Sequence, residues 1–349
     1  MRVTALLLAV AAAAPQHAEP HAPHASTLQR YEFHEAHMGT VFRTVLYAQD
    51  PASATQASRA AFRRIAELDT RLSDYSPASE LSLLVRRAAD GPVAVSDDLF
   101  AILGTAQTLA ARTSGAFDVT AGAATHLWRR ARRIGRLPTN AAIDAARRAS
   151  GYEHLLLDAS RRTVRFGQAG MQLDLGGIAK GYAADAALAE VRARGIPRAL
   201  VEAGGDVAAG DAPPGAKGWE VRLAGWDSKP DLQTTLVLSR AAVSTSGDLE
   251  QWLDADGVRH SHIVDPRTGR ALTERRLVSV IASDATTSDM LATAASVLGA
   301  PDAIRLVDET PASAILMISE GVNGVVRWSA SSRWPAPDPR TLPGSRSNP

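Results

Sequence analysis

The sequence of 349 residues contains no cysteine. This absence excludes disulfide bonds, thiolate catalysis, cysteine metal sites and a lipoprotein anchored through an N-terminal cysteine. The chain also lacks an excess of either charge: its formal net charge is +1, which provides no global field to attract nucleic acid or an anionic membrane. We therefore expect no nucleic-acid partner. Hydrophobic residues make up 45% of the chain, enough for one large domain or two packed subdomains.

Long apolar runs and the common catalytic motifs are missing as well. No stretch reaches the roughly 18 consecutive apolar residues that a membrane-spanning helix needs. Lys180-Gly181 reverses the Gly-Lys order of a phosphate-binding P-loop, and Ser246-Gly247 lacks the preceding glycine of a hydrolase nucleophile elbow. No His-Glu-x-x-His zinc motif occurs, and no Gly-x-Gly-x-x-Gly follows a strand. A functional site must therefore be assembled from dispersed residues.

The two ends of the chain differ in composition from the middle. Residues 1–14 carry an early Arg2 and then an apolar, alanine-rich run, which predicts a signal peptide and export to the periplasm. Residues 15–30 are rich in Ala, His and Pro and predict a flexible leader; its histidines could bind a metal, but a tether is the commoner role. Residues 331–349 predict a flexible tail. The expected folded domain therefore spans residues 31–330.

Apolar periodicity within this domain predicts a mixture of strands and helices. Strands are predicted at 40–47, 116–120, 154–158, 163–166, 171–173, 198–202, 219–223, 234–238, 242–243, 260–264, 277–282, 314–318 and 324–328. Helices are predicted at 53–73, 96–112, 139–150, 180–194, 286–298 and 301–308. A hydroxyl-rich loop is expected at 244–248. Because strands often follow one another directly, we expect an α+β fold with mixed or antiparallel sheets packed against helices, rather than regular βαβ winding.

The segment from Asp174 to Asp185 has the pattern of a strand end, a tight glycine turn and a helix. Free N–H groups in the first turn of a helix favour an anion such as phosphate. Lys180 lies in that turn, where the helix dipole disfavours a cation unless a negative ligand is nearby. An ordinary glycine turn with a solvated lysine explains the segment equally well.

Three further features could carry chemistry. Asp289 and Thr293 share a helix face, and a carboxylate with a hydroxyl suits Mg²⁺ rather than zinc, although a helix-terminal aspartate with a core threonine is commoner. His262 precedes Asp265-Pro266 on a predicted strand and is a candidate general base. A structural histidine is the commoner case, and His260 on the same face competes for the role. The Arg129–Arg133 cluster is more often a solvated helix face than a binding surface.

Taken together and in order, these segments resemble the ApbE-type FAD:protein FMN transferases. The specific motifs are Asp-Leu-Gly-Gly-Ile-Ala-Lys-Gly at 174–181 and His-Ile-Val-Asp-Pro-Arg-Thr-Gly at 262–269. Supporting matches are Met-Gly-Thr at 38–40, Ala-Phe-Asp at 116–118, Ala-Gly-Gly-Asp at 203–206, Ser-Thr-Ser-Gly at 244–247 and Asp-x-x-x-Thr at 289–293. The resemblance covers about residues 31 to 329. It implies an ApbE-like, T-fold-related architecture of two subdomains.

The resemblance also implies an enzyme that cleaves the FAD pyrophosphate, moves FMN onto a threonine or serine hydroxyl of a target flavoprotein and releases AMP. The acceptor would be a soluble flavoprotein or a subunit of a membrane redox complex, with an Asp-Gly…Ala-Thr type of site. By analogy, the FAD-binding residues would be Met38, Tyr75, Ala116, Phe117, Asp118, Asp174, Lys180 and Ile263. Asp289, Thr293 and the carbonyl of Gly177 would hold Mg²⁺, and His262 would take the proton of the acceptor hydroxyl.

This chain departs from the family pattern at several positions. Val119–Ala124 replaces a Gly-Pro-Leu-like run, which puts the local loop geometry in question. Glu202 stands where asparagine is usual and could change the charge near the flavin, and Met290 follows the metal aspartate where alanine is common. Two alternatives stay open: hydrolysis of FAD to FMN and AMP, and flavin binding without catalysis. The sequence names neither the acceptor nor the oligomeric state.

Overall fold

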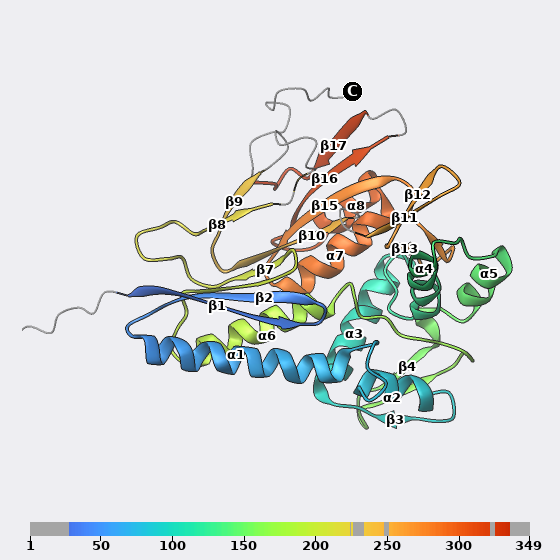
Figure 1. The fold of residues 1–349 in the computed structure, drawn as a ribbon, viewed down its shortest axis with the longest axis horizontal. Helices are drawn as coiled ribbons and strands as arrows, with labels where there is room; N and C mark the ends of the chain where they lie inside the picture. Colours follow the sequence, from blue (N-terminus) through green and yellow to red (C-terminus); the bar gives the residue numbers. More distant parts are fainter. Residues whose placement is uncertain (1–27, 224, 226–233, 248–250, 322–324, 336–349) are drawn as a thin grey trace, which may run out of the picture.

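A computed structural model describes residues 28–223, 225, 234–247, 251–321 and 325–335. An eight-stranded sheet organises the fold, and all of its neighbouring strands are antiparallel (Figure 1). In order across the sheet, the strands are β1 (Gln29–His37), β2 (Thr40–Ala48), β6 (Ala199–Ala203), β7 (Asp206–Ala209), β10 (Ala241–Gly247), β15 (Arg275–Ala282), β16 (Ala314–Glu320) and β17 (Val326–Ala330). The expected α+β class is therefore confirmed.

Four helices cover one face of this sheet: α1 (Pro51–Leu72), α6 (Ala179–Ala193), α7 (Ala285–Leu298) and α8 (Ala300–Asp308). Local sequence sets where α1 begins, because Asp50 accepts a hydrogen bond from Ser53 N at 2.8 Å and Pro51 occupies the first helical turn. Phe42 and Leu46 on β2 are fully buried against these helices. Alternation along the strand points Val45 to the other face.

That other face is covered by the hairpin of β8 (Trp219–Arg222) and β9 (Thr235–Leu238) and by Trp334. Trp334 is 8% exposed, and Ile315 N donates a 3.0 Å hydrogen bond to Ser331 Oγ. Packed side chains are therefore found past residue 330, and strand β1 begins at Gln29; the domain bounds of 31–330 stay a prediction.

A second, mainly helical part lies beside the sheet (Figure 1). It contains α2 (Glu80–Arg87), α3 (Asp97–Arg112), α4 (Gly122–Ile134), α5 (Asn140–Arg148), the 3-10 turn η1 (Tyr152–His154) and a sheet of β3 (Val93–Ala94), β5 (Thr163–Phe166) and β4 (Leu155–Asp158). The hairpins β11 (Trp252–Ala255) with β12 (Val258–Ser261), and β13 (Val264–Asp265) with β14 (Arg270–Ala271), contribute to a small core with α4 and α5.

Several local predictions were wrong. Met171–Leu173 buries its apolar side chains but forms a single bridge, Gln172 to Ala121, instead of a strand. Residues 116–120 form a bend and turn, and residues 244–247 belong to β10 because their hydroxyls find partners across the sheet and on α7. The strand expected at 260–264 is split between β12 and β13. Helix α4 was not predicted.

No helix within the described residues is long and apolar enough to cross a membrane. The predicted signal peptide, the leader up to residue 27 and the tail from residue 336 lie outside the described residues.

Candidate active site

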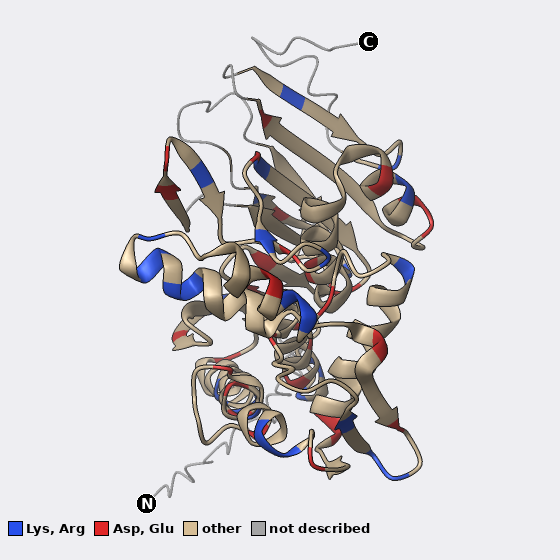
Figure 2. Ribbon diagram, turned by 90° about the vertical axis from the view of Figure 1, so that its right-hand side faces the viewer, with Lys and Arg blue, Asp and Glu red and all other residues tan. Residues whose placement is uncertain are grey.

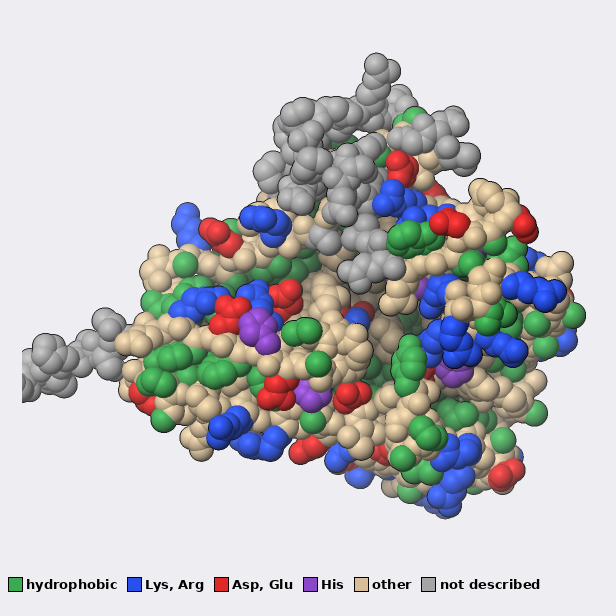
Figure 3. Space-filling view, in the orientation of Figure 1, with side chains coloured by type: hydrophobic (Ala, Val, Ile, Leu, Met, Phe, Trp, Pro, Cys, Tyr) green, Lys and Arg blue, Asp and Glu red, His purple; other side chains and the backbone are tan. Residues whose placement is uncertain are grey.

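A cavity of about 1870 Å³ is lined by residues of both the sheet and the helical part. In the space-filling view the surface is hollowed near the middle of the face shown (Figure 3). The cavity collects every site residue that the sequence predicted. These are Met38, Tyr75, Ala116, Phe117, Asp118, Asp174, Gly177, Lys180, His262, Ile263, Asp289 and Thr293. The structure thus places them together, while the role of each stays a prediction.

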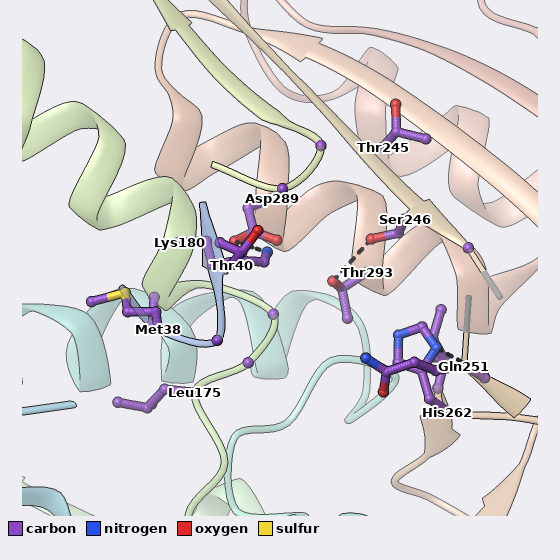
Figure 4. Close-up of a pocket in the computed structure, with 18 of the residues that line it drawn as sticks. Met38, Thr40, Leu175, Lys180, Thr245, Ser246, Gln251, His262, Asp289 and Thr293 are labelled. Carbon is purple, nitrogen blue, oxygen red and sulfur yellow. Dashed lines mark hydrogen bonds and ion pairs between the residues drawn. The ribbon is translucent and has the colours of Figure 1, made fainter. Parts of the chain in front are cut away.

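Lys180 lines the cavity and contacts two buried carboxylates, those of Asp206 and Asp289; Figure 4 shows it next to Asp289. Lys180 Nζ lies 2.6 Å from Asp206 Oδ2 and 3.6 Å from Asp289 Oδ2, and both carboxylate side chains are 3% exposed. Burial opposes the charged amine, but the two carboxylates outweigh it and raise the pKa of Lys180. Lys180 is therefore not the solvated lysine of the alternative interpretation.

Asp289 carries an electrostatic cost that a bound cation would relieve. Burial first, and repulsion from Asp206 second, raise the pKa of Asp289 to about 7. Lys180 and the N–H of Gly181, which donates to Asp289 Oδ2 at 3.1 Å, act in the opposite direction. One ammonium thus faces two buried carboxylates, so this part of the cavity favours additional positive charge.

The donors around Asp289 fit a hard metal ion. A Cβ on Gly177 would lie 2.9 Å from Thr293 Oγ1, so the Gly177 backbone lies directly against the Thr293 hydroxyl. Thr293 Oγ1 also lies 3.3 Å from Ser246 Oγ. Carboxylate, hydroxyl and carbonyl oxygens suit Mg²⁺. The described residues contain no group of three His, Cys, Asp or Glu that could hold a metal.

His262 lies in the bend between β12 and β13, so its predicted place on a strand was wrong. Its backbone N–H donates to Gln251 O at 3.1 Å, and its Nδ1 lies 3.3 Å from the same oxygen. An Nδ1–H donated to that carbonyl makes Nε2 the basic nitrogen. Figure 4 shows Thr293 and Ser246 between Asp289 and His262.

His260 does not compete for the role of base. Its ring stacks on Trp128 with centroids 5.3 Å apart, and it does not line the cavity. Its buried Nδ1 has no hydrogen-bond partner within the described residues, and burial lowers the pKa of the ring. His260 is therefore a packed residue of the small core around α4.

Arg129 contacts several residues in another part of the cavity wall, and the sequence analysis did not single it out as a site residue. Its guanidinium lies 2.7 Å from Asp74 Oδ2 and 3.2 Å from Asp174 Oδ2, and 4.3 Å above the centre of the Tyr75 ring. Asp74 also pairs with His126 Nε2 at 2.9 Å. The expectation of a purely solvated arginine face was therefore wrong for Arg129. The i, i+3 spacing of His126 and Arg129 was the signal available in the sequence.

The departures from the family pattern have local explanations. Glu202 pairs with Arg43, which lies directly opposite it across β2 and β6, at 2.6 Å, so its charge is balanced within the sheet. Asp118 accepts hydrogen bonds from Thr120 N at 2.8 Å and Thr120 Oγ1 at 2.7 Å. Burial raises the pKa of Asp118, and these bonds partly oppose the shift. The turn after Asp118 is thus built around its carboxylate. Nothing in the structure explains Met290 beyond its burial.

Comparison with known proteins supports one family. The ApbE family model matches residues 38–317. A protein named FAD:protein FMN transferase from Treponema pallidum is 33% identical over 309 residues, covering 83% of this chain and 85% of that protein. One of the same name from Vibrio cholerae is 30% identical over 305 residues, covering 84% and 89%.

Solved structures agree. The flavin transferase ApbE from Vibrio cholerae superposes with a TM-score of 0.78 at 28% identity, covering 87% of this chain and 98% of that one. The ApbE protein from Thermotoga maritima has a TM-score of 0.75 at 30% identity, covering 86% and 97%. With a family model spanning most of the folded part and this likeness in sequence and structure, the chain belongs to the ApbE family.

Proposed function

We propose that this protein is a Mg²⁺-dependent FAD:protein FMN transferase that modifies a threonine or serine hydroxyl of an acceptor flavoprotein and releases AMP. The observation that carries the proposal is the group formed by Lys180, Asp289, Thr293 and the Gly177 backbone in the same cavity as His262. The cavity, at about 1870 Å³, is larger than the roughly 300–1,000 Å³ typical of small-ligand pockets. It therefore has room for a dinucleotide and an acceptor side chain.

The reaction exchanges the phosphoanhydride bond of FAD for a phosphoester bond to the acceptor. The acceptor oxygen forms a bond to the phosphorus of the FMN half, the bond from that phosphorus to the AMP half breaks, and AMP leaves. The hydroxyl proton passes to His262 Nε2, because a neutral hydroxyl is a poor nucleophile until a base removes its proton. Transfer of this kind depends mainly on positioning and on stabilising charge at phosphoryl oxygens.

The chain's own residues prepare the site for that charge. Asp206 holds the Lys180 ammonium, which is aimed at the cavity beside Asp289. In the first turn of α6, which begins at Ala179, the N–H groups of Ala179 and Gly181 already donate to Leu175 O and Asp289 Oδ2, so the positive charge offered to a phosphate comes from Lys180. Asp289, Thr293 and the Gly177 carbonyl would hold Mg²⁺, which when bound would neutralise phosphoryl charge. Asp174, Tyr75 and Arg129 form another part of the cavity wall and would contact the flavin half.

We also propose that the enzyme works in the periplasm, since residues 1–14 have the pattern of a signal peptide. The acceptor would then be an exported flavoprotein or a membrane redox subunit exposed to that compartment.

Two variants test the assignment of roles. His262→Ala should bind FAD with unchanged affinity but lose transfer, measured by flavin fluorescence titration and by AMP release with an acceptor peptide. Asp289→Ala should lose AMP release. Loss of FAD binding in His262→Ala would make His262 structural, and wild-type AMP release in Asp289→Ala would refute the metal site. AMP release that is independent of the acceptor would favour FAD hydrolysis.

A further inference from the structure

Helix α4 ends in a group of arginines that the proposed reaction does not use. Residues 122–139 contain five arginines and no Asp or Glu, in a chain whose formal net charge is +1. Arg129, Arg132 and Arg133 fall at positions i, i+3 and i+4 and so share one side of α4, and Arg136 follows directly after its C-cap, Gly135. We call Arg130, Arg132, Arg133 and Arg136 the α4 basic stripe.

In the described part of the chain, the members of this stripe lack the carboxylate partners that Arg129, Arg64 and Arg71 have, as do Arg59 and Arg63 on α1; what sets the stripe apart is that its arginines are close together and beside the cavity. Arg129 is paired with Asp74 and Asp174, and on α1 both Arg64 and Arg71 pair with Asp98. Within the described residues, by contrast, no ion pair or side-chain hydrogen bond involves any arginine of the α4 basic stripe. Elsewhere on the ribbon, acidic and basic residues are interspersed (Figure 2). Unbalanced positive charge is therefore concentrated at this place.

The stripe is continuous with the cavity. Arg132 is half-buried and lines the cavity, whereas Arg130, Arg133 and Arg136 are exposed. In Figure 3, basic side chains gather over α4 and α5, next to the hollow. Two apolar residues of this region are also exposed to solvent: Ile134 is 57% exposed, and Tyr75, which lines the cavity, is 73% exposed. The surface beside the cavity mouth thus combines free cations with apolar contact area, as protein-binding surfaces do.

The helix dipole does not account for the stripe. Cations in the last turn of a helix are stabilised by the dipole, which covers Arg132 and Arg133. Arg136, however, lies beyond the C-cap Gly135, and Arg132 is destabilised: burial, and then repulsion from Arg129, lower its pKa. Like charges this close cost free energy unless a partner supplies negative charge.

We propose that the α4 basic stripe docks an acidic segment of the acceptor flavoprotein and guides the acceptor hydroxyl into the cavity. The inference rests on the proposed function. A polypeptide fits better than a nucleic acid or a lipid surface, because the partner must pass from exposed Arg133 and Arg136 to Arg132 and on into the cavity. Charge complementarity of this kind mainly sets encounter and specificity, and it is weakened by salt.

The test compares two double charge reversals of equal size in the full-length protein. Arg133→Glu/Arg136→Glu reverses the outer stripe without touching a cavity residue. Arg59→Glu/Arg63→Glu, on α1 and outside the cavity, is the matched control; both of its arginines are exposed and have no ion pair within the described residues. The probes are two fluorescein-labelled peptides with the same Asp-Gly…Ala-Thr site, extended by a run of glutamates or of glutamines. Binding is measured by anisotropy, with FAD present.

We expect the wild type and the Arg59/Arg63 control to bind the glutamate peptide about tenfold more tightly than the glutamine peptide at low salt. The Arg133/Arg136 variant should lose this preference while its FAD affinity is unchanged. Equal affinity for the two peptides in the wild type would overturn the proposal, as would an equal loss in both variants. It would also be overturned if anionic phosphatidylglycerol vesicles or single-stranded DNA, and not the peptide, distinguished the variants.

FMN transfer measured on the same samples keeps the two claims separate. A preference for the glutamate peptide without any FMN adduct would refute the transferase and leave the docking surface standing. Transfer to both peptides at equal efficiency, without a binding preference, would refute the docking surface alone.

Discussion

Gly181 is the position where the structure makes its sharpest energetic prediction. It lies in the first turn of α6, where this helix crosses α7, and a Cβ there would be 2.2 Å from Ala285 O and 2.9 Å from Asp289 Cβ. Ordinary carbon contacts are about 3.5–4 Å, so Gly181→Ala forces the two helices apart by roughly 1 Å. Overpacking costs about 1–3 kcal/mol, and two backbones in contact place this case at about 3 kcal/mol. Alanine is intrinsically better than glycine inside a helix by about 0.5–1 kcal/mol, so the net loss of unfolding free energy is roughly 2 kcal/mol.

Gly104→Ala is the matched control, since Gly104 also lies inside a helix, α3, but a Cβ there would meet no atom of a neighbouring element within 4 Å. We expect it to stabilise the protein by about 0.5–1 kcal/mol. Urea unfolding measures both changes, and an FAD titration should show weaker binding in Gly181→Ala, because Gly181 N–H donates to the Asp289 carboxylate. If both variants gained the same stability and bound FAD like the wild type, the close approach of α6 and α7 would be refuted.

Three further changes test other contacts in the molecule. Arg129→Ala should weaken FAD binding and cost about 1–2 kcal/mol of unfolding free energy, because Asp74 and Asp174 lose a shared partner; Arg129→Lys should recover part of both in the same titrations. The hydrogen bond to Asp74 raises the pKa of His126 above 6.5. The wild type should therefore be more stable than His126→Gln by its full margin below pH 6.5, and this margin should shrink as the pH rises through the raised pKa of His126. Urea unfolding of both proteins across this pH range measures the margin. Trp334→Ala should cost about 3–5 kcal/mol of unfolding free energy if the chain is packed beyond residue 330, whereas no loss would support a flexible tail from residue 331.

Much of the fold could be predicted because its signals are local. Side-chain oxygens of Ser96 and Thr139 cap α3 and α5 where the sequence indicated helix starts, whereas α1, capped by Asp50, begins at Pro51 rather than at the predicted residue 53. By contrast, α4 begins without a capping side chain and carries consecutive arginines, so its apolar face is hidden in the sequence. The order of strands in the sheet depends on long-range pairing, and no local pattern encodes it.

The candidate site divides in the same way. Asp289, Thr293, Lys180 and His262 stood out through motifs, and the cavity brings them together. Arg129 could not be selected, because its partners Asp74 and Asp174 are distant in sequence and an arginine run more often faces solvent. Asp206 belonged to a recognised motif, but its bond to Lys180 depends on how β7 packs against α6.

The most direct test of the central claim is intact-mass spectrometry of an acceptor peptide with the Asp-Gly…Ala-Thr type of site, incubated with the protein, FAD and Mg²⁺. We predict a mass increase equal to one FMN less water on the threonine, with AMP released in equal amount and the adduct lost in EDTA. Unmodified peptide, with FMN and AMP accumulating at the same rate whether or not the peptide is present, would contradict the transferase and establish FAD hydrolysis instead.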